Sequence, residues 1–503
     1  MSTILSKLVE GSLWATGARA MVNCLGLVST LLLARLLTPA DFGIVAIATV
    51  LQLIIAAVTN LSLAEALIQH EDPQPRHFDT VWTLGVLRSA LAAAVYALAA
   101  PWVARAFGEP RLEPVMAVLA LGIFLTGLAN PRRVMMQKKL IFWQDFMLKV
   151  GEKLTAVIVT VTIALLFRSY WALVWGVVAG QLAHLLISYS ILPYRPRPGL
   201  SGARMLFGFS VWLTLGQVVN TINWRFDQLL VGKFIGPAAL GLYTVGDNLA
   251  VMPTREATQP LTETLYPAFA QLSREPDRLR SAYQSAQALV TATALPLGIG
   301  MALLARPLVL AAMGQKWEGA VLVIQGLASI FALQTLGALA QPLAMALGRT
   351  RSLFNRDAVM FCVRLPIIIG GIAAAGLPGL IAGRIVAGLI AMIFNMTLVR
   401  GLIALPLGGQ VAANRRALLS VAAMALAVLA CRHMWEDGHS LAELLMTILL
   451  QVTLGALVYC GTSVLLWRLA GQPPGPESDV KRVLLALVDR VRPHDPRLQG
   501  TPR

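Results

Sequence analysis

The amino-acid sequence predicts an all-α polytopic membrane protein with about fourteen transmembrane helices, arranged as two six-helix lobes that are parallel repeats, plus two further helices. Three observations predict this class. Hydrophobic residues make up 57% of the 503 positions and charged residues only 13%, which leaves too little polar surface for a soluble protein. Apolar segments of about 20 residues, the length that crosses the hydrocarbon core, recur along the chain. Finally, part of the sequence repeats after 198 positions.

The repeat is carried by residue types that are uncommon in apolar sequence. The pairs are Trp14 with Trp212, Pro39 with Pro237, and Gly43 with Gly241. Between residues 12 and 43, eight positions are identical to their counterparts 198 residues later. This register indicates a duplication. Because the offset covers six spans, an even number, both copies enter the membrane in the same direction and are parallel repeats.

The expected spans follow in order along the chain. The first lobe, 1–193, has spans near 11–34, 43–66, 81–104, 114–130, 146–167 and 170–192. A proline-rich connector at 194–206 leads to the second lobe, 207–404, with spans near 207–232, 240–267, 285–312, 320–347, 354–376 and 379–404. Two more spans, 416–434 and 441–467, lie within 405–470.

The Lys and Arg residues between the spans predict the orientation. Connections on the side of the N-terminus hold eighteen of them and connections on the opposite side hold eight. By the positive-inside rule, both termini are expected in the cytoplasm. Much of the net charge of +16 is therefore a topology signal, and basic patches interleaved with aromatic residues, which would indicate nucleic-acid binding, are missing.

The segment 471–503 is expected to form a cytoplasmic tail with an amphipathic helix at 480–492, either on the inner membrane surface or docked on an inner loop. The four cysteines are dispersed through apolar segments without metal or disulfide spacing. We therefore expect no metal and no cofactor.

Basic residues inside or bordering the spans are the first candidates for function, because a charge in the bilayer is costly unless it faces a polar cavity or a partner. The eight are Arg19, Arg88, Lys149, Lys153, Arg225, Arg255, Arg364 and Arg384. For Arg88 and Arg384 we weigh snorkelling or an ion pair, and for Lys149 and Lys153 interfacial pairs with Asp145 and Glu152.

Polar groups recur at one depth in the first helix of each repeat. Arg19 and Asn23 lie four residues apart, on one helix face. The corresponding helix of the second repeat carries a stripe of Gln217, Asn220, Asn223 and Asp227, with Arg225 nearby. A shared central cavity explains both sets economically.

The expected span 240–267 is unusually charged and proline-rich. It contains Arg255, Glu256 and Glu263, with Pro253, Pro260 and Pro267 at seven-residue intervals. Because proline frees backbone carbonyls and bends a helix, such a segment is expected to line a cavity and to move.

The intramembrane charges favour an anionic substrate, since guanidinium groups match phosphate bidentately. We take Arg19, Asn23, Arg225, Arg255 and Arg364 as candidates to bind a lipid pyrophosphate. The carboxylates of Asp227, Glu256 and Glu263 are candidates for coupling to protons or a cation, with simple salt bridges to the arginines as the alternative.

Several short motifs, in order along residues 10 to about 404, resemble the polysaccharide (Wzx-like) flippases of the multidrug/oligosaccharidyl-lipid/polysaccharide exporter superfamily. The segments are Ala34 to Gly43, Leu63 to Ile68, Tyr170 to Leu173, Arg195 to Pro198, Asp227 to Gly232, Leu240 to Tyr243 and Leu265 to Pro267. The resemblance implies alternating access and movement of undecaprenyl-pyrophosphate-linked oligosaccharide across a bacterial inner membrane for exopolysaccharide or lipopolysaccharide synthesis. It also implies membrane lipids and the polysaccharide polymerase and export machinery as partners.

Three rival functions stay open. A membrane glycosyltransferase or polymerase is disfavoured because paired acidic metal motifs and a large outer loop are absent from the sequence. A cation-coupled antiporter of small solutes predicts a cavity rich in carboxylates and aromatic residues, whereas arginines are at least as numerous here. A peptidoglycan-precursor flippase shares the lipid pyrophosphate chemistry. The chain itself lacks the Gly-rich phosphate loop of an ATPase.

Overall fold

The structure is a computed structural model that describes residues 2–60, 67, 74–138, 142–201, 203–434, 440–473 and 475–478. Throughout these ranges the regular structure is helical, as the sequence predicts. The chain divides into two compact units, Met1–Val245 with Ala312–Ala320, and Gly246–Ala311 with Val321–Arg503. The limits expected for the two lobes remain a prediction.

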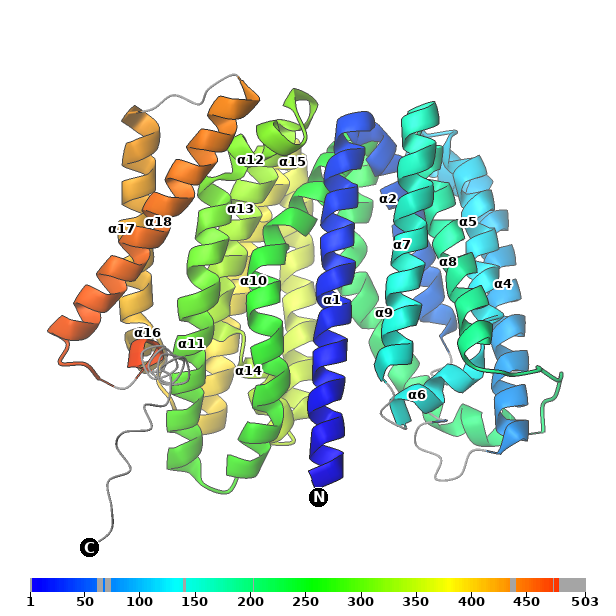
Figure 1. Ribbon diagram of the computed structural model, residues 1–503, viewed down its shortest axis with the longest axis horizontal. Helices are drawn as coiled ribbons and strands as arrows, with labels where there is room; N and C mark the ends of the chain where they lie inside the picture. The colour runs from blue at the N-terminus through cyan, green and yellow to red at the C-terminus, as the bar shows by residue number, and fades with distance from the viewer. Residues whose placement is uncertain are drawn as a thin grey trace, which may run out of the picture. The chain divides into compact units, whose positions relative to one another are not determined.

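Unit 1 contains the helices of the first repeat and the beginning of the second. They are α1 (Ser2–Leu36), α2 (Pro39–Thr59), α4 (Pro75–Phe107), α5 (Leu112–Gly127), η1 (Pro131–Arg133), α6 (Val134–Lys138), α7 (Phe142–Phe167), α8 (Trp171–Ile191), α9 (Ala203–Phe234), the first residues of α10 (Pro237–Leu272), and η2 (Gln315–Trp317). Within this unit α7 packs on α8, α4 on α5, and α5 on α8 (Figure 1).

Unit 2 contains the remaining helices. They are the rest of α10, α11 (Pro276–Leu303), α12 (Ala305–Ala312), α13 (Gly319–Gln334), η3 (Thr335–Gly337), α14 (Ala340–Ala346), α15 (Thr350–Ile403), α16 (Leu407–Ala413), α17 (Arg415–Met434) and α18 (Leu441–Leu469). The last two helices lie side by side (Figure 1), and α17 also packs on α11.

Each of the fourteen expected spans has a helical counterpart among the described residues. Ten helices there are long and apolar enough to cross a membrane, and α5 is a shorter apolar helix. One of the ten, α15, covers two expected spans, since its backbone is non-helical at Ala375 and Gly376, with φ of +60° at the glycine. Gly371 and Gly379 approach each other so closely that a Cβ on either would collide with the other's carbonyl. The two halves of α15 therefore form a hairpin. The helix predicted at 480–492 lies outside the described residues.

The start of α2 illustrates how the local sequence fixes a helix end. Pro39 occupies the first helical turn, where its missing N–H costs nothing. Thr38 and Asp41 form a capping box, in which the Thr38 hydroxyl accepts from the Asp41 N–H and the Asp41 carboxylate accepts from the Thr38 N–H at 2.9 Å. The turn between α1 and α2 is thus sharply defined.

The duplicated residues meet within unit 1. A Cβ built on Gly43 would lie 1.7 Å from the carbonyl oxygen of Pro237, and one built on Gly241 would lie 1.8 Å from that of Pro39. Pro39 and Gly43 are the sequence counterparts of Pro237 and Gly241. Each copy therefore presents the same two residues to the other, as a two-fold relation between parallel repeats requires.

A second reciprocal contact lies at the ends of the repeated helices. Arg35, at the end of α1, donates through Nε to the carbonyl of Ala312, the last residue of α12, which belongs to unit 1, at 2.8 Å. Its counterpart Lys233, at the end of α9, donates to the carbonyl of Ala106 near the end of α4. A cation at a helix C-terminus satisfies an unpaired carbonyl and opposes the negative end of the helix dipole.

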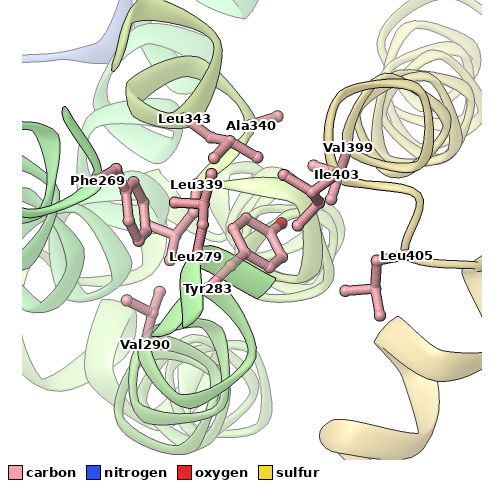
Figure 2. Packing of buried hydrophobic residues seen from close by; sticks show 10 residues of the cluster. All are labelled: Phe269, Leu279, Tyr283, Val290, Leu339, Ala340, Leu343, Val399, Ile403 and Leu405. Carbon is pink, nitrogen blue, oxygen red and sulfur yellow. The ribbon is translucent and has the colours of Figure 1, made fainter. Parts of the chain in front are cut away.

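A core cluster in unit 2 joins the ends of α10, α11, α14 and α15. Phe269 and Tyr283 place their rings 6.2 Å apart, and Leu339 and Leu343 pack near them, while Val399 and Ile403 approach from α15 (Figure 2). In a bilayer such clusters are stabilised by close van der Waals packing, because lipid tails are as apolar as the side chains.

Candidate transport site

The first candidate pair lies on α1. Arg19 and Asn23 are one helical turn apart and both are half-buried within unit 1. The side chain of Gln217, which the repeat register pairs with Arg19, lies outside what the structure describes. The two residues on α1 therefore retain the shared face that their spacing predicts.

The polar stripe on α9 ends in a buried carboxylate. Asp227 is 1% exposed, and its Oδ2 accepts a hydrogen bond of 2.6 Å from the hydroxyl of Tyr243, on α10. Its Oδ1 accepts from the backbone N–H of Gln228 at 3.0 Å. Arg225, two residues earlier, donates to the Gln228 side chain at 3.5 Å. Asp227 is thus held by hydrogen bonds from a tyrosine hydroxyl and a backbone N–H.

The charges of α10 form local pairs within unit 2. Arg255 and Glu256 make an ion pair of 3.3 Å between adjacent residues, both of them accessible. Gln259 donates to the exposed Glu263 at 3.1 Å, one turn further on. The helix continues through Pro253, Pro260 and Pro267 without ending. The candidates on α10 are therefore open to solvent-accessible space, unlike Asp227.

Of the two candidate arginines on α15, Arg364 and Arg384, Arg384 is the more enclosed. It is 9% exposed and its Nη2 lies 3.3 Å from Asp247 Oδ1, with the guanidinium 5.8 Å from the ring centroid of Phe331. An ion pair is the arrangement expected for Arg384 when it is not a substrate ligand. Arg364, in the first half of α15, is half-buried.

Two of the remaining basic residues, Arg88 and Lys149, have structural partners. Arg88 lies 3.5 Å from the amide oxygen of Asn60, and Lys149 forms the expected ion pair with Asp145, at 2.7 Å. Among the described residues, no three His, Cys, Asp or Glu side chains gather as metal ligands.

A row of three hydrogen-bonded polar side chains, from α7, α8 and η1, was not predicted from the sequence. The His184 ring contacts Glu152 Oε2 at 2.8 Å through Nδ1 and Arg133 Nη1 at 2.9 Å through Nε2. Since arginine only donates, Nε2 accepts and the Nδ1–H donates to Glu152. The available signal was a histidine inside an expected span, but its partners are 32 and 51 residues away.

Fold and site together define a class: a polytopic, helical membrane protein built from duplicated halves, with ionisable side chains inside its spans. Residues 32–322 match the model of a family described as "Polysaccharide biosynthesis protein", and the chain belongs to that family. This match confirms the resemblance found in the short motifs.

Individual relatives and structures agree with this assignment. The lipopolysaccharide biosynthesis protein WzxC of Escherichia coli (strain K12) is 23% identical over 401 residues, 78% of this chain and 81% of its own length. The succinoglycan biosynthesis transport protein ExoT of Rhizobium meliloti (strain 1021) is 23% identical over 60% of this chain and 62% of its own. The lipid II flippase MurJ in an inward closed conformation shares the fold, with a TM-score of 0.71, 12% identity, and coverage of 91% of this chain and 99% of that one.

Proposed function

We propose that the protein is a flippase that moves undecaprenyl-pyrophosphate-linked oligosaccharide across the bacterial inner membrane by alternating access, for exopolysaccharide or lipopolysaccharide synthesis. The observation that carries the proposal is the family match, which covers residues 32–322 and so includes parts of both copies of the repeat. Relatives named for lipopolysaccharide and succinoglycan biosynthesis support it. Both termini are proposed to lie in the cytoplasm, from the Lys and Arg distribution.

The proposed ligand chemistry follows from the arginines. A pyrophosphate carries its charge on oxygens that a guanidinium can bind with two parallel N–H donors. We assign this role to Arg19, Arg225, Arg255 and Arg364, with Asn23 as an uncharged donor beside Arg19. All five are at least partly accessible, a requirement for contact with a passing substrate.

The carboxylates are proposed to serve coupling, each in a different setting. Asp227 is buried and hydrogen-bonded to Tyr243, and its carboxylate is the group proposed to take up the coupling proton or cation. Glu256 and Glu263 are more accessible, and a change in either would alter a pair on α10. Polysaccharide polymerase and export proteins are the proposed partners.

A peptidoglycan-precursor flippase and a small-solute antiporter remain the alternatives. The structural similarity to MurJ supports the fold alone, since the sequences are only 12% identical. The family match therefore decides in favour of polysaccharide precursors.

The arginine assignment is tested by complementation of a strain that lacks its polysaccharide flippase. Arg19, Arg255 and Arg364 are replaced singly by alanine and by lysine, and surface polymer is measured at equal membrane levels of protein. Arg278→Ala, which removes an exposed arginine paired with Glu275, is the matched control. We expect loss of polymer with alanine, partial retention with lysine, and no loss in the control. Full polymer in all three alanine variants would refute the assignment.

A further inference from the structure

A groove lies between the two halves of the α15 hairpin, at the end away from the turn and next to α14. Its cavity volume is about 700 Å³, and it is lined on one side by Arg349, Ser352 and Arg356 and on the other by Phe394 and Thr397, among others. All the lining residues belong to unit 2, and none is among the groups assigned above to pyrophosphate or coupling.

The groove is electropositive at the end that holds Arg349 and Arg356, which we call its shallow end. Among the described residues, the Arg349 guanidinium has no ion-pair or hydrogen-bond partner, and it is exposed. Arg356 is held in place by Asp357, at 2.7 Å, and by the amide oxygen of Asn395, at 3.1 Å. Those contacts use three of its five N–H donors, so two remain for a ligand. The two arginines face one carboxylate, which leaves an excess positive charge.

Deeper along the hairpin the lining becomes apolar. Val359 is ten residues beyond Arg349, or about 15 Å at the helical rise of 1.5 Å per residue. On the returning half, Phe394 is deepest, followed by Leu398 and Leu402 toward the shallow end. The side chains of Val359 and Phe394 are exposed within the expected spans, where the surroundings are hydrocarbon.

We propose that this groove binds an anionic glycerophospholipid of the adjoining leaflet. The phosphate would contact Arg349 and Arg356, with the Ser352 and Thr397 hydroxyls beside it, and an acyl chain would run along Val359 and Phe394. Basic pockets between transmembrane helices near a membrane surface have this preference, because they combine charge attraction with apolar contact for the chain. A glycerophospholipid is the occupant because it surrounds the groove at high concentration and carries both parts.

The test uses the purified full-length protein in mild detergent, with dioleoyl phosphatidylglycerol or phosphatidylcholine added at equal concentration and bound lipid counted by native mass spectrometry. The variants are Arg349→Gln, Arg356→Gln and the double variant. Arg351→Gln is the matched control, since Arg351 is exposed on the same turn of α15 and does not line the groove.

We expect the wild type and the control to retain phosphatidylglycerol over phosphatidylcholine, with retention falling about fivefold for each groove arginine removed. Arg349→Gln keeps the test decisive if Arg356→Gln fails to fold, because Arg349 makes no contact that the fold needs. Equal retention in Arg349→Gln and Arg351→Gln, or no preference between the two lipids, would overturn the proposal. Displacement of phosphatidylglycerol by a lower concentration of undecaprenyl pyrophosphate would also overturn it, by assigning the groove to the carrier lipid.

Discussion

Gly43 on α2 faces the carbonyl of Pro237 at the start of α10, at a separation that leaves no room for a Cβ: the added atom would lie 1.7 Å from the oxygen. The duplicated pair, Gly241 and Pro39, makes the same contact at 1.8 Å. The two glycines are therefore required where the repeat-related helices α2 and α10 cross. The sequence register identifies the glycines as equivalent, and the structure shows that they lie at the same contact.

We expect Gly43→Ala and Gly241→Ala to destabilise the protein by similar amounts, each by about 1–3 kcal/mol, because both force the same backbones apart. The double variant should lose less than the sum, since the first substitution already separates the helices. Thermal unfolding in detergent measures this. Gly300→Ala is the control: its Cβ meets nothing within 4 Å, so stability should be unchanged or higher. Strictly additive losses would argue against a shared crossing.

Substitutions at Asp227 and Tyr243 distinguish a coupling role of the Asp227 carboxylate from a structural role. Tyr243→Phe removes the hydroxyl that donates to Asp227, and should lower stability by about 1–3 kcal/mol because a buried carboxylate loses a donor. Transport per folded molecule should survive in Tyr243→Phe and be lost in Asp227→Asn, which cannot be ionised. Reconstituted transport normalised to folded protein is the measurement. Parallel losses of stability and transport in both variants would assign Asp227 to structure alone.

The Arg384–Asp247 pair should behave as a buried ion pair within unit 2. Asp247→Asn leaves a guanidinium that is 9% exposed without its carboxylate, and we expect a loss of about 3 kcal/mol. Adding Arg384→Met should restore part of the stability, because the uncompensated charge is removed as well. A double-mutant cycle from thermal unfolding tests this coupling, and a sum of independent effects would contradict it.

The ion pair between Glu109 and Arg111, in the turn after α4, predicts that the stability of the protein depends on pH. The hydrogen bond from Arg111, at 2.7 Å, holds the pKa of the Glu109 carboxyl below its ordinary value. Because this pKa is lowered in the folded state, the interaction contributes its full stabilisation at pH values above the ordinary carboxyl pKa of about 4.3. That stabilisation is lost as the pH falls through the lowered pKa. The difference in stability between wild type and Glu109→Gln should be small, about 0.5 kcal/mol, since Arg111 is 46% exposed.

Thermal unfolding from pH 7 to the acid limit of solubility should show that difference constant above about pH 5 and shrinking below it. A difference that grows as the pH falls would contradict the assigned sign.

Hydropathy predicted the helices well because span length is a property of the bilayer. The sequence predicted the hairpin of α15 as two spans, 354–376 and 379–404, and the structure places the break between them at Ala375 and Gly376. The register of 198 predicted the parallel repeat. A further equivalent pair, Gly108 and Gly314, which both have positive φ after the ends of α4 and α12, falls outside that register. Those two are 206 residues apart, so an insertion of eight residues concealed them from a fixed offset.

The partners of the charged residues could not be predicted in the same way. Arg384 and Asp247 are 137 positions apart, and neither helix periodicity nor the repeat places them together. The Glu152, His184 and Arg133 chain likewise depends on how α8 packs against α7 and η1. Local patterns identify which groups are costly in a membrane, whereas tertiary packing selects the partner of each.

Transfer of a fluorescent undecaprenyl-pyrophosphate oligosaccharide between leaflets of proteoliposomes that contain only this protein tests the proposed function most directly. We predict transfer well above that of protein-free liposomes, and reduced transfer when Arg19, Arg255 or Arg364 is replaced by alanine. Transfer no faster than in protein-free liposomes, with correctly folded protein and in the presence of proton or sodium gradients, would contradict the proposal that the protein flips lipid-linked oligosaccharide.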